Sequence, residues 1–359
     1  MNLAKIDPNF RIESKIERKG LRFFPIDQAP FCVYGVVKEN GTYRRMPETV
    51  ARSVSEGVYA LHTHTAGGRV RFVTDSPYVA IHAKLGSIGR MSHFSLIGSA
   101  GFDLYSREEG KEIYRGSFFP PYDMTDGYES LVEFKDNSYA TPERKRREIT
   151  INFPTYSEVR DLYIGLDEES YVEAPSPYRF ETPIVYYGHS ITQGGCASRP
   201  GYVYPSILSR RFHCDFVNLG FSGSAKGESA MAKYLAGLEM KLLVLDYDHN
   251  APTADFLRQT HEPMFRILRE SQPDLPIILL TTTPKLHYAG ENSERVEVVS
   301  ATYQNAKARG DRNVYFLNGS QVCDTSDGPA GATVEGSHLN DIGFQNLADA
   351  LEKIMAPLL

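Results

Sequence analysis

The chain has 359 residues, of which 41% are hydrophobic and 23% charged, and its formal net charge is −6. This composition is typical of a globular protein with a sizeable core, and the acidic balance argues against a nucleic-acid partner. The length favours two domains. The N-terminus lacks the apolar segment of a signal peptide, and no run reaches the length of a membrane-spanning helix. We therefore expect a cytoplasmic protein with neither a membrane nor a nucleic acid as partner.

Short alternating segments dominate the chain up to about residue 171. Apolar and polar residues alternate in the segments 69–74, 78–83 and 147–153, which predicts strands with one buried face. Turn-forming residues such as Asp75-Ser76-Pro77 separate these segments. The pattern favours an all-β sandwich or jelly roll, which we place at residues 1–175.

A proline-rich stretch at residues 173–183 is typical of a linker, and the pattern then changes. Short apolar strands now alternate with amphipathic helices. The expected strands are 184–187, 215–219, 242–245, 276–280 and 314–317, and the expected helices are 204–212, 229–238, 256–270, 295–308 and 343–354. The alternation predicts an α/β domain at residues 183–359, with a parallel sheet covered by helices on both faces.

Residues suited to catalysis follow these expected strands. Ser190 follows the first strand, Gly220 and Gly223 follow the second, Asn250 follows the third, and Glu335 and His338 lie between the fifth strand and the last helix. Because parallel sheets of this kind bind ligands at the carboxyl ends of their strands, we expect these residues to converge on one edge.

These residue types match the needs of acyl transfer. A serine hydroxyl such as that of Ser190 is a weak nucleophile and requires a base, which His338 can provide. A carboxylate on the other ring nitrogen, here that of Glu335, would orient the imidazole and stabilise its charged form. The N–H groups of Ser190 and Gly223 and the Asn250 amide are candidate donors to the oxyanion.

The second half resembles the SGNH (GDSL-type) hydrolase family, whose sequence blocks supply Ser, Gly, Asn and His in this order. The segments 190–195 and 338–344 make the resemblance specific. It implies that Ser190 is the nucleophile, Gly223 and Asn250 are oxyanion donors, and His338 is the base; Gly220 is an alternative to Gly223. The absence of a Gly-x-Ser-x-Gly elbow and of a phosphate-binding Gly-Lys-Ser/Thr favours a flavodoxin-like three-layer α/β/α fold.

The first half contains Gly101-Phe102-Asp103-Leu104-Tyr105. This segment resembles the GxDLY motif of a β-rich domain that precedes one SGNH subgroup, which includes a salicylyl-transferring esterase. The resemblance implies a jelly-roll-like sandwich packed on the catalytic domain. Asp103 and Tyr105 could reach the active site, but Asp often stabilises turns, and we favour a structural role.

Two residues depart from the family pattern. His189 precedes the nucleophile where the family usually has Asp, and Glu335 stands three residues before the histidine where Asp is usual. We favour Glu335 as the triad acid because a triad is defined by geometry and role. Asp341, Asp248 and a Ser–His dyad are the alternatives. For His189 we favour a side chain under the rim of the sheet over one that lines the acyl pocket.

Other polar residues near the expected site have two interpretations each. Arg199 could bind an anionic or hydroxylated substrate or form an ion pair that holds its loop, and His249 could border the pocket or lie on the surface. His62 and His64 form a His-x-His on an expected strand, so both side chains would share one face. Because no third metal ligand is evident, we favour ordinary surface or domain-interface histidines over a metal site. The four cysteines (Cys32, Cys196, Cys214 and Cys323) are too widely spaced to indicate a disulfide framework or a metal site.

The sequence therefore predicts a serine esterase that removes short acyl groups, above all acetyl, from a hydroxylated substrate such as a sugar. The reaction would proceed through an acyl-Ser190 intermediate and use no metal or other cofactor. Acyl transfer to an alcohol is the enzymatic alternative, and a carbohydrate-binding protein with a decayed site is the non-enzymatic one. The expected partner is a small-molecule or oligosaccharide ester, and the sequence leaves a homo-oligomer open.

Overall fold

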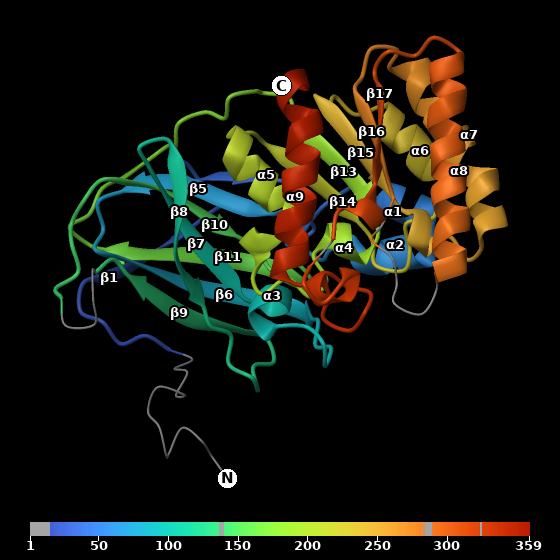
Figure 1. The fold of residues 1–359 in the computed structure, drawn as a ribbon. Helices are drawn as coiled ribbons and strands as arrows, with labels where there is room; N and C mark the ends of the chain where they lie inside the picture. Colours follow the sequence, from blue (N-terminus) through green and yellow to red (C-terminus); the bar gives the residue numbers. More distant parts are fainter. Residues whose placement is uncertain (1–14, 136–139, 282, 284–288, 324) are drawn as a thin grey trace.

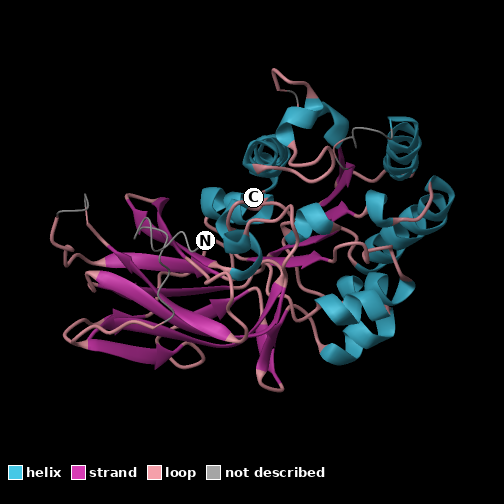
Figure 2. Cartoon of the chain, turned by 90° about the horizontal axis from the view of Figure 1, so that it is seen from below, coloured by secondary structure: helices cyan, strands magenta, loops and turns pink. Residues whose placement is uncertain are grey.

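The computed structural model describes residues 15–135, 140–281, 283, 289–323 and 325–359. Two antiparallel sheets occupy the first half and a parallel sheet the second, so the strand-rich and helix-rich parts lie side by side (Figures 1 and 2). Within the described residues, no helix is both long and apolar enough to cross a membrane. This arrangement confirms a β-rich part followed by an α/β part.

The first half is a sandwich of two antiparallel sheets. One sheet has the order β1 (Leu21–Pro25), β11 (Ser157–Asp167), β6 (Tyr78–Ile88) and β9 (Gly127–Glu133). The other has the order β12 (Val172–Glu173), β5 (Arg69–Thr74), β10 (Arg147–Asn152), β7 (Phe102–Glu108) and β8 (Lys111–Phe118), with β2 (Cys32–Tyr34) also paired to β5. Side chains that point inward from both sheets, such as Phe72, Ile81 and Ile149, form one apolar core.

Three short helices interrupt this β-rich half, and the alternation pattern did not predict them; one of them, α3 (Leu96–Ala100), lies between β6 and β7. A short hairpin of β3 (Val37–Glu39) and β4 (Thr42–Arg44) leads into α1 (Glu48–Val54) and α2 (Glu56–Leu61). Ala51 and Val58 on these helices pack into the core of the second half, beside α6 (Ser229–Ala236). The expected strand at His62 and His64 is wrong, because α2 ends at Leu61 and a turn follows.

The second half contains a five-stranded, wholly parallel sheet. Its order is β14 (Phe216–Gly220), β13 (Ile184–Gly188), β15 (Leu242–Asp246), β16 (Ile277–Thr281) and β17 (Val314–Asn318). The central strands are buried along their whole length, which is why they are apolar on both faces. Counted from the first strand of this sheet, the order is 2-1-3-4-5, the flavodoxin-like order that was expected.

Helices cover both faces of the parallel sheet and complete three layers (Figure 1). On one face, α5 (Tyr204–Phe212) and α9 (Asp341–Met355) enclose an apolar core with the strands. On the other face lie α6, α7 (Ala254–Ser271) and α8 (Ala289–Ala308). In α9 the apolar residues Phe344, Leu347 and Leu351 recur at helical spacing and all face the core. Five helices follow the predicted segments, with boundaries shifted by a few residues.

The register of the central strands brings the candidate residues together. Gly188 at the end of β13 pairs with Gly220 of β14 on one side and with Asp246 of β15 on the other. The three segments that follow these strands therefore leave the sheet at the same level. Ser190 lies on the first segment, Gly223 on the second and Asn250 on the third.

Candidate active site

Ser190 is the first residue of α4 (Ser190–Gln193), a short helix directly after β13. The turn between strand and helix is tight: a Cβ added to Gly188 would lie 2.2 Å from Thr192 Oγ1 and 2.6 Å from the Asp246 carbonyl oxygen. Only glycine fits at this position. As the first residue of a helix, Ser190 also has an N–H group without an intrahelical acceptor. The Ser190 side chain and N–H therefore both lie at the edge of the sheet.

Ser190, His338 and Glu335 form a continuous chain of hydrogen bonds. Ser190 Oγ lies 2.8 Å from His338 Nε2, and His338 Nδ1 lies 2.7 Å from Glu335 Oε1. Both distances are within the range expected for a nucleophile, its base and the group that orients the base. The geometry thus places the predicted Glu335 where a triad acid is needed, despite its additional methylene group.

A tight loop before α9 produces this arrangement. Thr333 and Leu339 form an isolated β-bridge, and the Val334 N–H donates to the His338 carbonyl oxygen at 2.8 Å. Gly336 has a φ of +84°, a conformation that glycine adopts readily, and it reverses the chain between the two catalytic candidates. Glu335 Oε1 also accepts the backbone N–H of His338 at 2.9 Å. The three-residue spacing therefore allows Glu335 to reach back to the imidazole.

The electrostatic surroundings favour a neutral imidazole beside a charged carboxylate. Burial lowers the pKa of His338 below its ordinary value of 6.5, and the Glu335 carboxylate acts in the opposite direction. Burial acts to raise the pKa of Glu335, but hydrogen bonds from the His338 N–H and imidazole outweigh it and lower this pKa overall. At neutral pH, His338 is therefore ready to accept a proton.

Three groups are the expected donors to the oxyanion: the Ser190 N–H, the Gly223 N–H and the Asn250 side-chain amide. The Asn250 side-chain amide uses one N–H to donate to the Phe221 carbonyl oxygen at 2.9 Å, which leaves its second N–H for another acceptor. A Cβ added at Gly223 would meet no atom within 4 Å, so the turn there is open. The Gly220 N–H, in contrast, donates to Asn218 Oδ1 at 2.9 Å. Of the two glycines considered, the structure favours Gly223.

His189 is buried beneath this edge, where it borders a small cavity together with Asp246 and Leu280. Its Nδ1 accepts the Ile191 N–H at 3.1 Å and thereby caps α4, while its Nε2 lies 3.1 Å from Asp246 Oδ1. Because Nδ1 accepts a hydrogen bond, the ring proton is on Nε2 and points to the carboxylate. The side chain therefore performs the N-capping that Asp often performs. Its buried position agrees with the interpretation that it lies under the rim of the sheet, but the capping was not predicted.

The two alternative triad acids are engaged elsewhere. Asp341 accepts hydrogen bonds from the Ser198 N–H at 2.9 Å and from its hydroxyl at 2.5 Å. Asp248 lies with an oxygen 3.9 Å from His189 Nε2. His249, the neighbour of Asp248, stacks on His189 with ring centroids 6.3 Å apart. Glu335 is thus the carboxylate that contacts the His338 imidazole.

The β-rich half also reaches the site, through residues that the sequence analysis missed. The rings of His93 and Phe94 lie 5.5 Å and 6.3 Å from that of His338, measured between centroids. Tyr156 packs against Phe94, and its hydroxyl donates to the Ser190 carbonyl oxygen at 3.3 Å. Nothing in the spacing of these residues signals this role, because it arises from packing between the two halves.

A buried arginine supports the loop that contains Gly223. Arg45 donates to the Gly220 carbonyl oxygen, to the Asn218 carbonyl oxygen at 3.2 Å and to the Leu61 carbonyl oxygen at 2.7 Å. Its guanidinium lies 4.5 Å from the centroid of the Phe221 ring, and burial lowers its pKa to about 9. The β-rich half thereby anchors the end of β14.

The GxDLY segment holds the loop that follows α4. Asp103 is fully buried and accepts the Gly201 N–H at 2.7 Å and the Asn152 amide at 2.8 Å. Arg199 lies 3.9 Å from Asp103 and stacks on Tyr114 and Tyr202. These contacts favour a structural role for both residues over the substrate-binding interpretation of Arg199.

Comparisons with known proteins agree with this geometry. A model of the GDSL-like lipase/acylhydrolase family matches residues 181–356, and a model of the N-terminus of SGNH-hydrolase-type esterases, the GxDLY domain, matches residues 21–172. Together they match most of the chain. No curated protein matches the sequence.

Solved structures share the fold over nearly the whole chain. A GDSL-like lipase from Bacteroides ovatus is 25% identical, with 94% of this chain and 98% of that chain covered and a TM-score of 0.84. A salicylyl-acyltransferase from a tetracycline biosynthetic pathway is 18% identical, with 95% and 98% covered and a TM-score of 0.72. A family two carbohydrate esterase from Clostridium thermocellum, solved with cellohexaose, is 17% identical, with 82% and 94% covered and a TM-score of 0.58. The last two similarities show the fold alone. The chain therefore belongs to the GDSL-like lipase/acylhydrolase family of ester hydrolases, with a GxDLY domain ahead of its α/β domain.

Proposed function

We propose that the protein is a serine esterase that removes short acyl groups, above all acetyl, from hydroxylated substrates such as sugars. The observation that carries this proposal is the chain of hydrogen bonds from Ser190 through His338 to Glu335. A decayed site would not be expected to keep both bonds at 2.8 and 2.7 Å. The catalytic alternative is therefore favoured over a binding protein that has lost its activity.

The first half of the reaction forms an acyl-enzyme. Ser190 Oγ attacks the ester carbonyl carbon while its proton passes to His338 Nε2. When the tetrahedral intermediate collapses, the bond between carbon and the alcohol oxygen breaks, and His338 donates its proton to the leaving alcohol. Glu335 holds the His338 ring and stabilises its positive charge throughout.

The second half releases the acid. A water molecule loses a proton to His338, attacks the acyl carbon and displaces Ser190, which regains its proton. In both halves the oxyanion would accept hydrogen bonds from the Ser190 and Gly223 N–H groups and the Asn250 amide. One such donor typically contributes about 3 kcal/mol to the stabilisation of the transition state.

The surroundings of His338 support a small acyl group. The rings of Phe94 and Tyr156 pack against each other with centroids 4.7 Å apart, and Phe94 lies beside Gly195, where an added Cβ would be 3.1 Å from its ring. Aromatic rings this close to the nucleophile leave limited room for a long acyl chain. A sugar as the alcohol part is supported by structural neighbours that are described as a family two carbohydrate esterase and an acetyl xylan esterase.

The proposal is tested by acyl release from p-nitrophenyl esters and acetylated oligosaccharides. We expect the wild type to hydrolyse p-nitrophenyl acetate faster than the octanoate and to deacetylate the oligosaccharides. Ser190→Ala should lose both activities. Failure of the wild type on every ester would contradict the esterase proposal, and equal rates for the two proteins would exclude Ser190 as the nucleophile.

Acyl transfer to an alcohol is the second candidate. The salicylyl-acyltransferase among the structural neighbours supports this candidate, since 98% of its chain is covered in the comparison. Product analysis with an added alcohol separates the two functions. A transferase gives the new ester at the expense of free acid when the alcohol is present at millimolar concentration, whereas a hydrolase gives acid throughout.

A further inference from the structure

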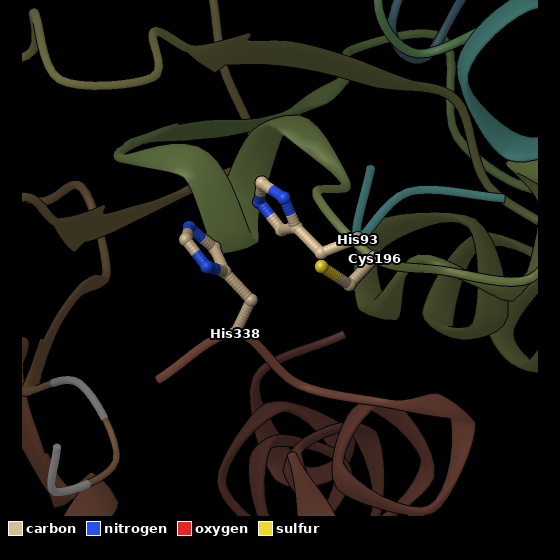
Figure 3. A group of neighbouring side chains, drawn as sticks. All are labelled: His93, Cys196 and His338. Atoms are coloured by element: carbon tan, nitrogen blue, oxygen red, sulfur yellow. The ribbon is translucent and has the colours of Figure 1, made fainter. Parts of the chain in front are cut away.

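Three side chains that can bind a metal ion lie together at the active site. They come from separate segments: His93 from a loop of the β-rich half, Cys196 from the loop after α4, and His338 from the loop before α9 (Figure 3). One ligand atom from each lies within 4.8 Å of the other two. Glu335 Oε2 is 3.9 Å from Cys196 Sγ and adds an oxygen at the same place.

We propose that His93, Cys196 and His338 bind Zn²⁺ or a similar borderline-soft divalent cation, and that this ion inhibits the enzyme reversibly. Two imidazoles and a thiolate, with a carboxylate oxygen or water as the fourth ligand, form a set that zinc prefers. In a tetrahedral zinc site, neighbouring ligand atoms are about 3.3–3.6 Å apart. Since His93 and His338 are both partly exposed, rotation of their side chains can close the remaining distance of about 1 Å.

Binding of the ion would be incompatible with catalysis. Both ring nitrogens of His338 are in use, Nε2 with Ser190 and Nδ1 with Glu335. Whichever nitrogen binds the metal, one of these hydrogen bonds is lost. The proposal therefore rests on the roles proposed above for Ser190 and His338. Coordination also releases the Cys196 thiol proton to solvent, since the thiolate is the ligand.

The site links the two halves of the chain. His93 lies in the loop at residues 89–95 of the β-rich half, whereas Cys196 and His338 belong to the α/β part. An ion at this position would join the β-rich half directly to the catalytic base. The buried group of His189, Asp246 and Asp248 differs in this respect, because all three of its residues belong to the α/β part.

The test is a Zn²⁺ titration of p-nitrophenyl acetate hydrolysis, with a blank without enzyme and reversal by EDTA. We expect Zn²⁺ to abolish wild-type activity and Mg²⁺, which prefers oxygen ligands, to leave it unchanged. In Cys196→Ala and His93→Gln, the Zn²⁺ concentration for half inhibition, relative to each variant's own rate without metal, should rise by about tenfold or more. The matched controls Cys214→Ala and His82→Gln should respond as the wild type does. Equal inhibition of all variants, or none of the wild type, would overturn the proposal.

Co²⁺ binding provides a second measurement that does not depend on turnover. A thiolate-to-cobalt charge-transfer band should appear with the wild type and with Ser190→Ala, and it should be absent in Cys196→Ala. If the wild type hydrolyses no ester, the proposed function fails, but a band that depends on Cys196 would still support the metal site. If esters are hydrolysed and no such band forms, the metal site fails and the proposed function stands.

Discussion

Two histidine–carboxylate pairs contact α4 at or beside Ser190, and only one of these histidines can act as the base. His338 is held by Glu335 at 2.7 Å, and His189 is held by Asp246 at 3.1 Å. In each pair one ring nitrogen faces the carboxylate and the other accepts a hydrogen bond. Each pair combines an imidazole with a carboxylate, so the difference between the pairs must come largely from their surroundings.

The surroundings differ in burial and in the group that faces the second nitrogen. The side chains of His338 and Glu335 are 24% and 37% exposed, whereas those of His189 and Asp246 are 3% and 2% exposed. The second nitrogen of His338 faces the Ser190 hydroxyl, but that of His189 faces the Ile191 N–H. A hydroxyl can give up its proton, and a backbone amide cannot do so at any pH the protein survives. The first pair is therefore suited to catalysis and the second to holding α4.

Removal of the His338 imidazole should have the largest effect. We expect His338→Ala to lower kcat/KM by about 10⁴-fold or more, because the base, the acid and the activated hydroxyl are lost together. The double variant with Ser190→Ala should be no slower than either single variant, since the residues act as a unit. Because the His338 side chain is partly exposed, the free energy of unfolding of the His338→Ala variant, measured in urea, should differ from that of the wild type by less than about 1 kcal/mol. A loss of only tenfold in kcat/KM would contradict its role as the base.

Replacement of the first carboxylate should have the next largest effect. Glu335→Gln keeps an acceptor for the ring but removes the charge that stabilises the imidazolium, and we expect kcat to fall by about 10²–10⁴-fold. Glu335→Asp restores the residue type usual in the family but shortens the side chain, so it should be intermediate. Steady-state kinetics on p-nitrophenyl acetate measure both. If Glu335→Gln retained full activity, the site would operate as a Ser–His dyad.

Changes to the second pair should affect stability more than chemistry. His189→Asp would place a third carboxylate beside Asp246 and Asp248 without a positive charge, and we expect a loss of about 3 kcal/mol at pH 7. His189→Asn keeps an acceptor for the Ile191 N–H and a donor for Asp246, and should cost about 1–2 kcal/mol. Urea unfolding measures both. If His189→Asp were as stable as the wild type, Asp246 would not depend on the His189 ring for its partner.

The positions of the catalytic candidates could be predicted from the sequence, because most of them follow the ends of predicted strands. Apolar strands that alternate with helices predict a parallel sheet, and its register brings the segments after β13, β14 and β15 together. Ser190 and His338 follow from that logic. Glu335 could be predicted for a local reason. It precedes His338 by three residues with Gly336 between them, and this spacing allows its side chain to reach back to the imidazole.

The remaining features depend on contacts between distant segments. Neither the packing of His93 against His338 nor the hydrogen bonds of Arg45 to the end of β14 leaves a periodic trace in the sequence. The helices α1 and α2 are each under eight residues long, too short for a clear helical period, and their apolar residues serve the core of the other half. The capping by His189 was likewise unpredictable in detail, because it depends on which ring nitrogen faces the Ile191 N–H.

The smallest expected effect is a shift of the pH profile, and its sign separates the two pairs. Since the base must be neutral, kcat/KM should rise with pH through the pKa of His338, which burial places below 6.5. Glu335 raises that pKa, so in Glu335→Gln the acidic limb should move to lower pH. The helix cap assigns a neutral ring to His189, so His189→Asn should leave the limb in place. A charged His189 would act to lower the pKa of His338. A shift to higher pH in this variant would show instead that His189 carries a positive charge, and the tautomer assigned from the helix cap would be wrong.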